Sequence, residues 1–210
     1  ASMRVDKSSR FKPDNRTGYF PSIGLGWNAS REAFVQKLNI FERLKFKASY
    51  GILGNQAIGN RYPTSAVVTS ALYAVFGGGE SINTGATILS ASNPNLKWES
   101  SKQSDIGVEA GFLDGRFSLE ADWYVRNTFD IIADVPIPDY VGSQNNPFVN
   151  TAQVINKGWD LTFNWREART VTYAFSANSS PVSNEIRKLA QGKTESISAF
   201  INGEPATKTE

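Results

Sequence analysis

Apolar side chains recur at every second position in about six segments of this chain, and this alternation constrains the fold more than any other feature. Successive side chains of a β-strand point to opposite faces of its sheet. Between Phe117 and Arg126 the odd positions are apolar and the even positions are polar. The other segments are Ser22–Ala29, Leu44–Ile52, Asp105–Phe112, Ile155–Arg166 and Val171–Asn178. The pattern predicts an all-β, antiparallel fold with about six long strands.

The lengths of the strands and of their connections restrict this fold further. Strands of about ten residues exceed the usual five or six of a soluble sheet and match a tilted strand that crosses a hydrocarbon layer. Short turns alternate with long connections along the chain. The short turns are Leu113–Arg116, which contains Asp-Gly, and Glu167–Thr170, and the long connections are Gly54–Ser101 and Ala133–Gln153. Short periplasmic turns and long extracellular loops are typical of an up-and-down transmembrane β-barrel.

Aromatic residues lie near the inferred strand ends, where a barrel carries a girdle at each lipid interface. Large aromatic residues are also common in any sheet core, so both interpretations stay open. These residues are Tyr19, Phe20, Trp27, Phe41, Trp98, Phe112, Phe117, Trp165 and Tyr173.

The composition excludes several classes of function. The 210 residues contain no His and no Cys, which removes histidine-based triads, thiolate nucleophiles and the commonest metal ligands. The net charge of +2 gives no field that favours nucleic acid. No apolar run approaches the roughly 18 residues of a transmembrane helix. We therefore predict a protein that is not an enzyme and that has no cofactor, no metal and no nucleic-acid partner.

Glu120 and Asp122 share one face of their strand and could suggest the carboxylate pair of a glycosidase. The polar interior of a barrel explains them more simply, with Arg126, Lys45 or Lys47 as the counter-charges. We therefore interpret the two carboxylates as lining of the interior.

The two long connections carry the candidate substrate contacts. Their aromatic rings, amides and rigid prolines suit contacts with a sugar or a peptide. The same residues suit packing against a neighbouring loop or a partner that acts as a lid. The candidates are Tyr140, Asn145, Asn146, Phe148, Tyr62 and Tyr73.

Several short strings resemble, in their order along the chain, the SusC/RagA family of TonB-dependent transporters of Bacteroidetes outer membranes. Together they span most of residues 8 to 165, although each string alone is compositionally ordinary. The strings are Ser8–Phe11, Gly18–Gly24, Leu44–Gly51, Gly54–Gln56, Asn93–Glu99 and Asn156–Asp160.

The resemblance implies a barrel of about twenty-two strands, preceded by an N-terminal plug and a segment that contacts TonB. Neither is expected within these residues, so residues 1–210 are interpreted as part of the barrel domain. The family resemblance further implies import of oligosaccharides or peptides across the outer membrane, with TonB and a SusD-like surface lipoprotein as partners. In the complete protein the outer-membrane lipid would surround the wall.

A soluble β-sandwich that binds carbohydrate is the alternative from another functional class. It predicts that the apolar rows pack against a second sheet. The transporter interpretation predicts that these rows face lipid. Burial of the Trp123 and Phe163 rows inside a compact body would contradict the transporter.

Overall fold

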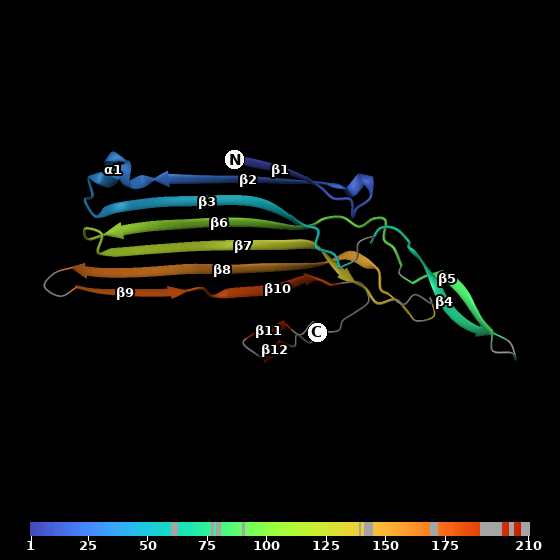
Figure 1. The fold of residues 1–210 in the computed structure, drawn as a ribbon. Helices are drawn as coiled ribbons and strands as arrows, with labels where there is room; N and C mark the ends of the chain where they lie inside the picture. The colour runs from blue at the N-terminus through green and yellow to red at the C-terminus, as the bar shows by residue number, and fades with distance from the viewer. Residues whose placement is uncertain are drawn as a thin grey trace.

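An eight-stranded antiparallel sheet forms most of the computed structural model (Figure 1). Its strands are β1 (Ser2–Lys7), β2 (Thr17–Asn28), β3 (Phe41–Asn55), β6 (Glu99–Phe112), β7 (Phe117–Asp134), β8 (Phe148–Ala168), β9 (Thr172–Ser179) and β10 (Val182–Lys188). The structure describes residues 1–59, 63–76, 78, 81–89, 91–138, 140, 145–168, 172–189, 199–201 and 204–206.

The remaining described elements are short. A separate hairpin pairs β4 (Val68–Phe76) with β5 (Ser81–Ile88), and β11 (Ala199–Ile201) pairs with β12 (Glu204–Ala206). Two 3₁₀ turns, at Pro13–Asn15 and Ala29–Arg31, and the one-turn helix α1 (Ala33–Gln36) lie in connections. In the part of the chain that the structure describes, no helix has the length and apolar character needed to cross a bilayer.

The strands follow the order β1-β2-β3-β6-β7-β8-β10, and β9 also pairs with β8. Leu161 of β8 lies opposite Ser179, and Gly158 lies opposite Val182. The backbone N–H of Trp159 donates to the carbonyl of Pro181 (3.2 Å), so the ladder continues across the interruption. β9 and β10 therefore act as one strand laid end to end along the edge of β8 (Figure 1).

All six predicted strands are present, but most are longer than the predicted ten or so residues. β6, β7 and β8 contain 14, 18 and 21 residues. The predicted strands were too short because the alternation of apolar and polar residues weakens before the hydrogen-bonded ladder ends. The strands continue well beyond their apolar stretches.

The two ends of the sheet differ as predicted. The end with the β6–β7 turn and α1 is called the short-turn end, and the end that carries the β4–β5 hairpin is called the long-loop end (Figure 1). In the β6–β7 turn Leu113, Asp114 and Gly115 have positive φ angles of 57°, 56° and 72°. The Asp-Gly pair tolerates this left-handed backbone, which closes the turn in four residues. The β8–β9 turn at residues 169–171 lies outside the described residues.

The register aligns the apolar residues into rows that cross the sheet. Leu25, Ala48, Ile106, Trp123 and Trp159 form one such row on consecutive strands. This side of the sheet is called the apolar face and the opposite side the polar face. The apolar face is open: Leu25 is 69% exposed, Ile106 59% and Trp159 52%.

No second sheet covers the apolar face among the described residues. Trp123 and Phe163 are only half-buried, and the largest fully buried side chains, Phe11 and Leu96, belong to a separate cluster at the long-loop end. A sandwich requires two facing apolar layers. The sheet is a single layer, so the sandwich prediction is not supported.

The apolar face has a limited height. On β7 it runs from Phe117 to Val125, and the next row is mixed: Lys102, Asn127 and Glu185 lie in it beside Ile52 and Ile155. About nine residues at about 3.3 Å each, tilted by about 40°, span roughly 20 Å along the barrel axis. This height is close to the apolar band of about 25 Å that transmembrane barrels present to lipid.

The aromatic residues near the strand ends divide between the two interpretations that the sequence left open. Rings at the short-turn end lie on the apolar face, whereas Phe20 and Trp98 at the long-loop end pack against each other. Phe41 and Phe112 pack at a tilt on the apolar face with ring centroids 4.9 Å apart. Phe20, only 7% exposed, instead packs edge-on against Trp98. The pairing of β2 with β3 ends at Ser22, and beyond that point the Phe20 ring lies against Gly54.

Candidate functional site

The polar face carries a network of three cations and three carboxylates at the level of the apolar band. Lys47 is its centre: its Nζ lies 2.6 Å from Glu120, 3.0 Å from Asp122 and 3.8 Å from Glu109. Lys45 lies 3.3 Å from Glu109, and Arg43 also pairs with Glu109. The network joins β3, β6 and β7 and balances its own charge.

A glycine gap makes this network possible. Gly107 lies between Lys47 on β3 and Asp122 on β7 in one row of the register. A Cβ at Gly107 would collide with the Asp122 carboxylate and would lie 2.6 Å from Lys47 Cε. Without a side chain at this position the ion pair forms across the middle strand. One ammonium thus holds both Glu120 and Asp122, as expected for a structural lining.

A row of amides and charges follows toward the long-loop end. Arg126 donates from Nε (3.0 Å) and Nη2 (2.9 Å) to Oε1 of Gln103. Nε2 of Gln103 in turn donates to Asp105 (2.9 Å). Arg126 was a predicted counter-charge for Glu120 and Asp122, but the register places it opposite Gln103 and Asn156 instead. Lys47 alone fulfils that role.

Beyond this row the polar face becomes aliphatic. A β-bulge between Thr128 and Ile131, with Asp130 at φ +54°, shifts the pairing of β7 with β8 by one residue. The shift turns Ile131 toward the same side as Arg126. The resulting open hollow, called the aliphatic hollow, has a volume of about 920 Å³. Its apolar lining comprises Ile131, Ala133, Ala152, Val154, Val182, Ile186 and Leu189.

The predictions did not include the aliphatic hollow. In strict alternation Ile131 would share the apolar face with Val125, because both positions are odd. The signal that could have revealed the change is the adjacent pair Ile131–Ile132, which breaks the period of two.

At the long-loop end a compact cluster, called the rim core, joins segments that lie far apart in the sequence. Phe11, Ile58 and Leu96 are buried at its centre, and Trp98, Ile132 and Phe148 pack against them. Three of the strings that carry the family resemblance contribute to this cluster or adjoin it. They are Ser8–Phe11, Gly54–Gln56 and Asn93–Glu99.

Hydrogen bonds from the same strings fasten the rim core. Arg10 Nη1 donates to the carbonyls of Gln56 (3.1 Å) and Ile58 (2.9 Å). Asn93 Nδ2 donates to the carbonyl of Phe148 (2.9 Å). The backbone N–H of Lys97 donates to the Asn150 side chain, whose amide donates back to the Lys97 carbonyl. These residues hold the ends of the strands together at the base of the loops.

The structure separates the predicted substrate contacts. Phe148 belongs to the rim core, and the backbone N–H of Asn145 donates to the carbonyl of Leu89 (3.0 Å). Tyr140 is 90% exposed and Asn146 is also exposed. Tyr73, on β4 of the separate hairpin, is 70% exposed. Tyr62 lies outside the described residues.

Comparison with known proteins identifies the family. A family model described as "TonB dependent receptor-like, beta-barrel" matches residues 1–202. The chain belongs to this family. TonB-dependent receptor barrels are outer-membrane proteins, and the family comprises receptors and transporters.

Individual relatives agree with this membership. The TonB-dependent receptor SusC of Bacteroides thetaiotaomicron is 36% identical over 196 residues, which is 91% of this chain and 19% of SusC. TonB-dependent receptor P26 of Formosa agariphila is 35% identical over 95% of this chain and 20% of its own length. The SusC/RagA resemblance is thereby confirmed.

Solved structures show the same fold. The RagAB peptide importer in its closed-closed state superposes with a TM-score of 0.77 at 34% identity, covering 91% of this chain and 20% of that chain. Its open-open state gives a TM-score of 0.76. The chain therefore spans about a fifth of the length of these relatives, and the single-layer sheet corresponds to part of a barrel wall.

Proposed function

We propose that this chain is part of the barrel wall of a SusC-like, TonB-dependent transporter that imports oligosaccharides or peptides across the outer membrane. The observation that carries the proposal is the single-layer sheet, with one face apolar and exposed over a bilayer-like height and the other face charged. The peptide alternative has additional support because the RagAB structures are those of a peptide importer.

In this proposal the wall contributes shape and hydration, and it has no catalytic step of its own. The charged network of Lys47 keeps the polar face hydrated without leaving a net charge that would trap a substrate. The rim core fixes the base of the loops, so that loop residues can meet the substrate at defined positions. The import energy would come from TonB acting through an N-terminal region, and a SusD-like lipoprotein would cover the long-loop end.

We further propose that substrate contacts come from Tyr140, Asn145, Asn146, Phe148, Tyr62 and Tyr73. Among them, Tyr140 has the strongest structural support because its ring is almost fully exposed and free to stack on a sugar or a peptide side chain. Phe148 and Asn145 would act mainly by holding the loop in place, since both are engaged at its base.

The test is uptake by the complete transporter with its surface lipoprotein, in cells with and without TonB. We expect TonB-dependent uptake of labelled oligosaccharides or peptides, and a Tyr140→Ala variant with about ten-fold weaker binding by calorimetry, as for a stacking contact of about 1.4 kcal/mol. Tyr19→Ala, which removes another exposed tyrosine, is the matched control. Uptake that does not depend on TonB, or a complete protein that is monodisperse without detergent, would refute the proposal.

A further inference from the structure

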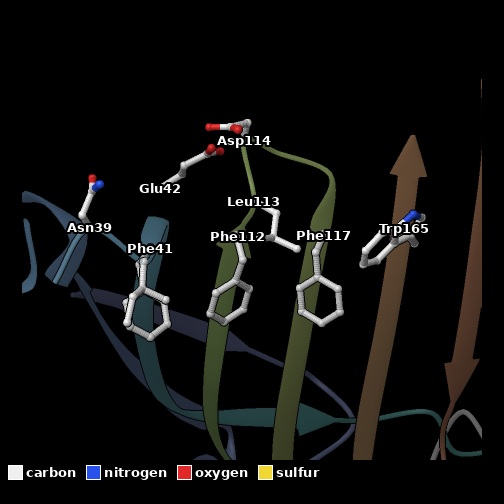
Figure 2. Close-up of a pocket in the computed structure, with 9 residues that line it drawn as sticks. Asn39, Phe41, Glu42, Phe112, Leu113, Asp114, Phe117 and Trp165 are labelled. Atoms are coloured by element: carbon white, nitrogen blue, oxygen red, sulfur yellow. The ribbon is translucent and has the colours of Figure 1, made fainter. Parts of the chain in front are cut away.

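A second hollow lies on the apolar face at the short-turn end, away from the path proposed for the substrate. Its volume is about 720 Å³, and it is formed by β3, β6, β7 and β8 with the β6–β7 turn. Figure 2 shows a row of four aromatic rings on adjacent strands, Phe41, Phe112, Phe117 and Trp165. The polar side chains of the hollow lie above the Phe41 and Phe112 part of this row. We call it the aromatic hollow.

The aromatic row forms a continuous shelf. The register places each ring opposite the next on the neighbouring strand, in the order Phe41, Phe112, Phe117 and Trp165. Their successive ring centroids are 4.9, 5.2 and 6.3 Å apart. The shelf is the last row of the apolar face, so in an outer-membrane barrel it lies where the acyl chains meet the headgroups.

The polar edge of the aromatic hollow is acidic. Glu42 and Asp114 are exposed, and their carboxylates extend toward the same space beyond the shelf (Figure 2). A Cβ placed on Gly115 would lie 3.6 Å from Glu42 Oε2, so Glu42 reaches across to the β6–β7 turn. Within the described residues neither carboxylate forms an ion pair.

The cation of the turn, Arg116, is already engaged. Arg116 donates from Nε to the carbonyl of Leu113 (2.9 Å), and its Nη1 lies 3.3 Å from Glu167. A ligand at this edge therefore meets two carboxylates on one side and aromatic faces on the other. This combination attracts a cation that is attached to an apolar tail.

We propose that the aromatic hollow binds a membrane phospholipid whose headgroup carries a primary ammonium, such as phosphatidylethanolamine. The ammonium donates hydrogen bonds to Glu42 and Asp114, and an acyl chain covers the shelf from Phe41 to Trp165. All phospholipids carry a phosphate that the carboxylates repel, and a glycerol headgroup has no cation to offset this repulsion. A trimethylated ammonium keeps the charge but has no N–H to donate.

The consequence is a preferred lipid at the short-turn rim. A lipid held at both its headgroup and its chain fixes the height of this wall in the bilayer, as aromatic and charged anchors do in other membrane proteins. This binding is separate from import, because the aromatic hollow and the polar face lie on opposite sides of the sheet.

The experiment uses the complete transporter, purified in detergent and mixed with equal amounts of phosphatidylethanolamine, phosphatidylcholine and phosphatidylglycerol. Native mass spectrometry then counts the lipids that stay bound. We expect phosphatidylethanolamine to be retained in preference to the other two. The double substitution Glu42→Gln and Asp114→Asn should lower this preference about five-fold, as for two exposed charge pairs.

Two further variants separate the contributions. Trp165→Ala should reduce the retention of all three lipids, because it removes part of the shelf. Asp14→Asn with Asp134→Asn, two exposed carboxylates at the long-loop end, should leave the preference unchanged. Heat-modifiable migration in gels reports that each variant is folded, and uptake reports import independently. Equal retention of the three lipids, or a preference unchanged in the Glu42 and Asp114 variant, would overturn the proposal.

Discussion

The same strands change in polarity along their length. At the level of the Trp123–Trp159 row the apolar side chains are on one face and Lys47, Asp122 and their partners are on the other. Toward the long-loop end the first face mixes Lys102, Asn127 and Glu185 with Ile52 and Ile155. The second face carries the aliphatic hollow, whose lining also includes Arg126 and Asn156. The comparison teaches that a strand does not keep one polarity per face along its whole length. The outer face is apolar over the height that a barrel presents to lipid, and polar side chains enter where that height ends.

The two regions also differ in how they are covered. The apolar band has no protein layer over it in the described residues and depends on lipid for its burial. The rim core buries Phe11 and Leu96 with its own chain and fastens them with hydrogen bonds. The local stability of the apolar band should therefore depend on the surrounding lipid. The local stability of the rim core should depend on the packing of its own side chains.

The largest effect is expected from the rim core. Phe11→Ala in the complete transporter should destabilise this region by about 3–5 kcal/mol, because the ring is 1% exposed and its removal leaves a cavity. Hydrogen exchange should accelerate in residues 8–16, 55–59 and 93–98. Phe34→Ala, where the ring is 60% exposed, is the matched control. Equal effects of the two substitutions would contradict the view that the rim core is stabilised by its own packing.

A charge in the apolar band should have the next largest effect. Ala121 lies near the middle of the band, opposite Val108 and Leu161. Ala121→Arg should cost about 2–4 kcal/mol, because the guanidinium must enter the hydrocarbon. Thr162→Arg, one position away on the polar face of β8, should change the stability by less than about 1 kcal/mol because it lies opposite Glu120. Denaturant titrations in lipid vesicles measure both, and similar losses would mean that the faces are assigned wrongly.

The smallest of the three effects is expected from the charged network. Lys47→Met removes the shared partner of Glu120 and Asp122 and should destabilise the transporter by about 1–2 kcal/mol, between the values for exposed and buried ion pairs. Lys45→Met should cost less, because Glu109 keeps Arg43. A double-mutant cycle of Lys47→Met with Asp122→Asn measures the coupling across Gly107. A coupling near zero would show that the pair contributes nothing.

Much of the fold could be predicted because it is expressed in local patterns. The six strands, the Asp-Gly turn and the alternation of short and long connections all appear in the structure. The substrate contacts were less predictable: the composition of the loop around Tyr140 and Phe148 did not distinguish an exposed ring from one packed in the rim core. That distinction depends on which distant segment lies beside each ring.

By itself the sequence determined which residues share a face between Phe117 and Arg126, because the period of two is a local property of extended backbone. The tertiary structure decided what the register brings together. It placed Asp122 beside Lys47, packed Phe20 against Trp98, and turned Ile131 to the polar face through the bulge at Asp130. Such contacts join positions that are far apart in the chain, or follow from a one-residue shift in pairing, and neither is expressed in the alternation of a single strand.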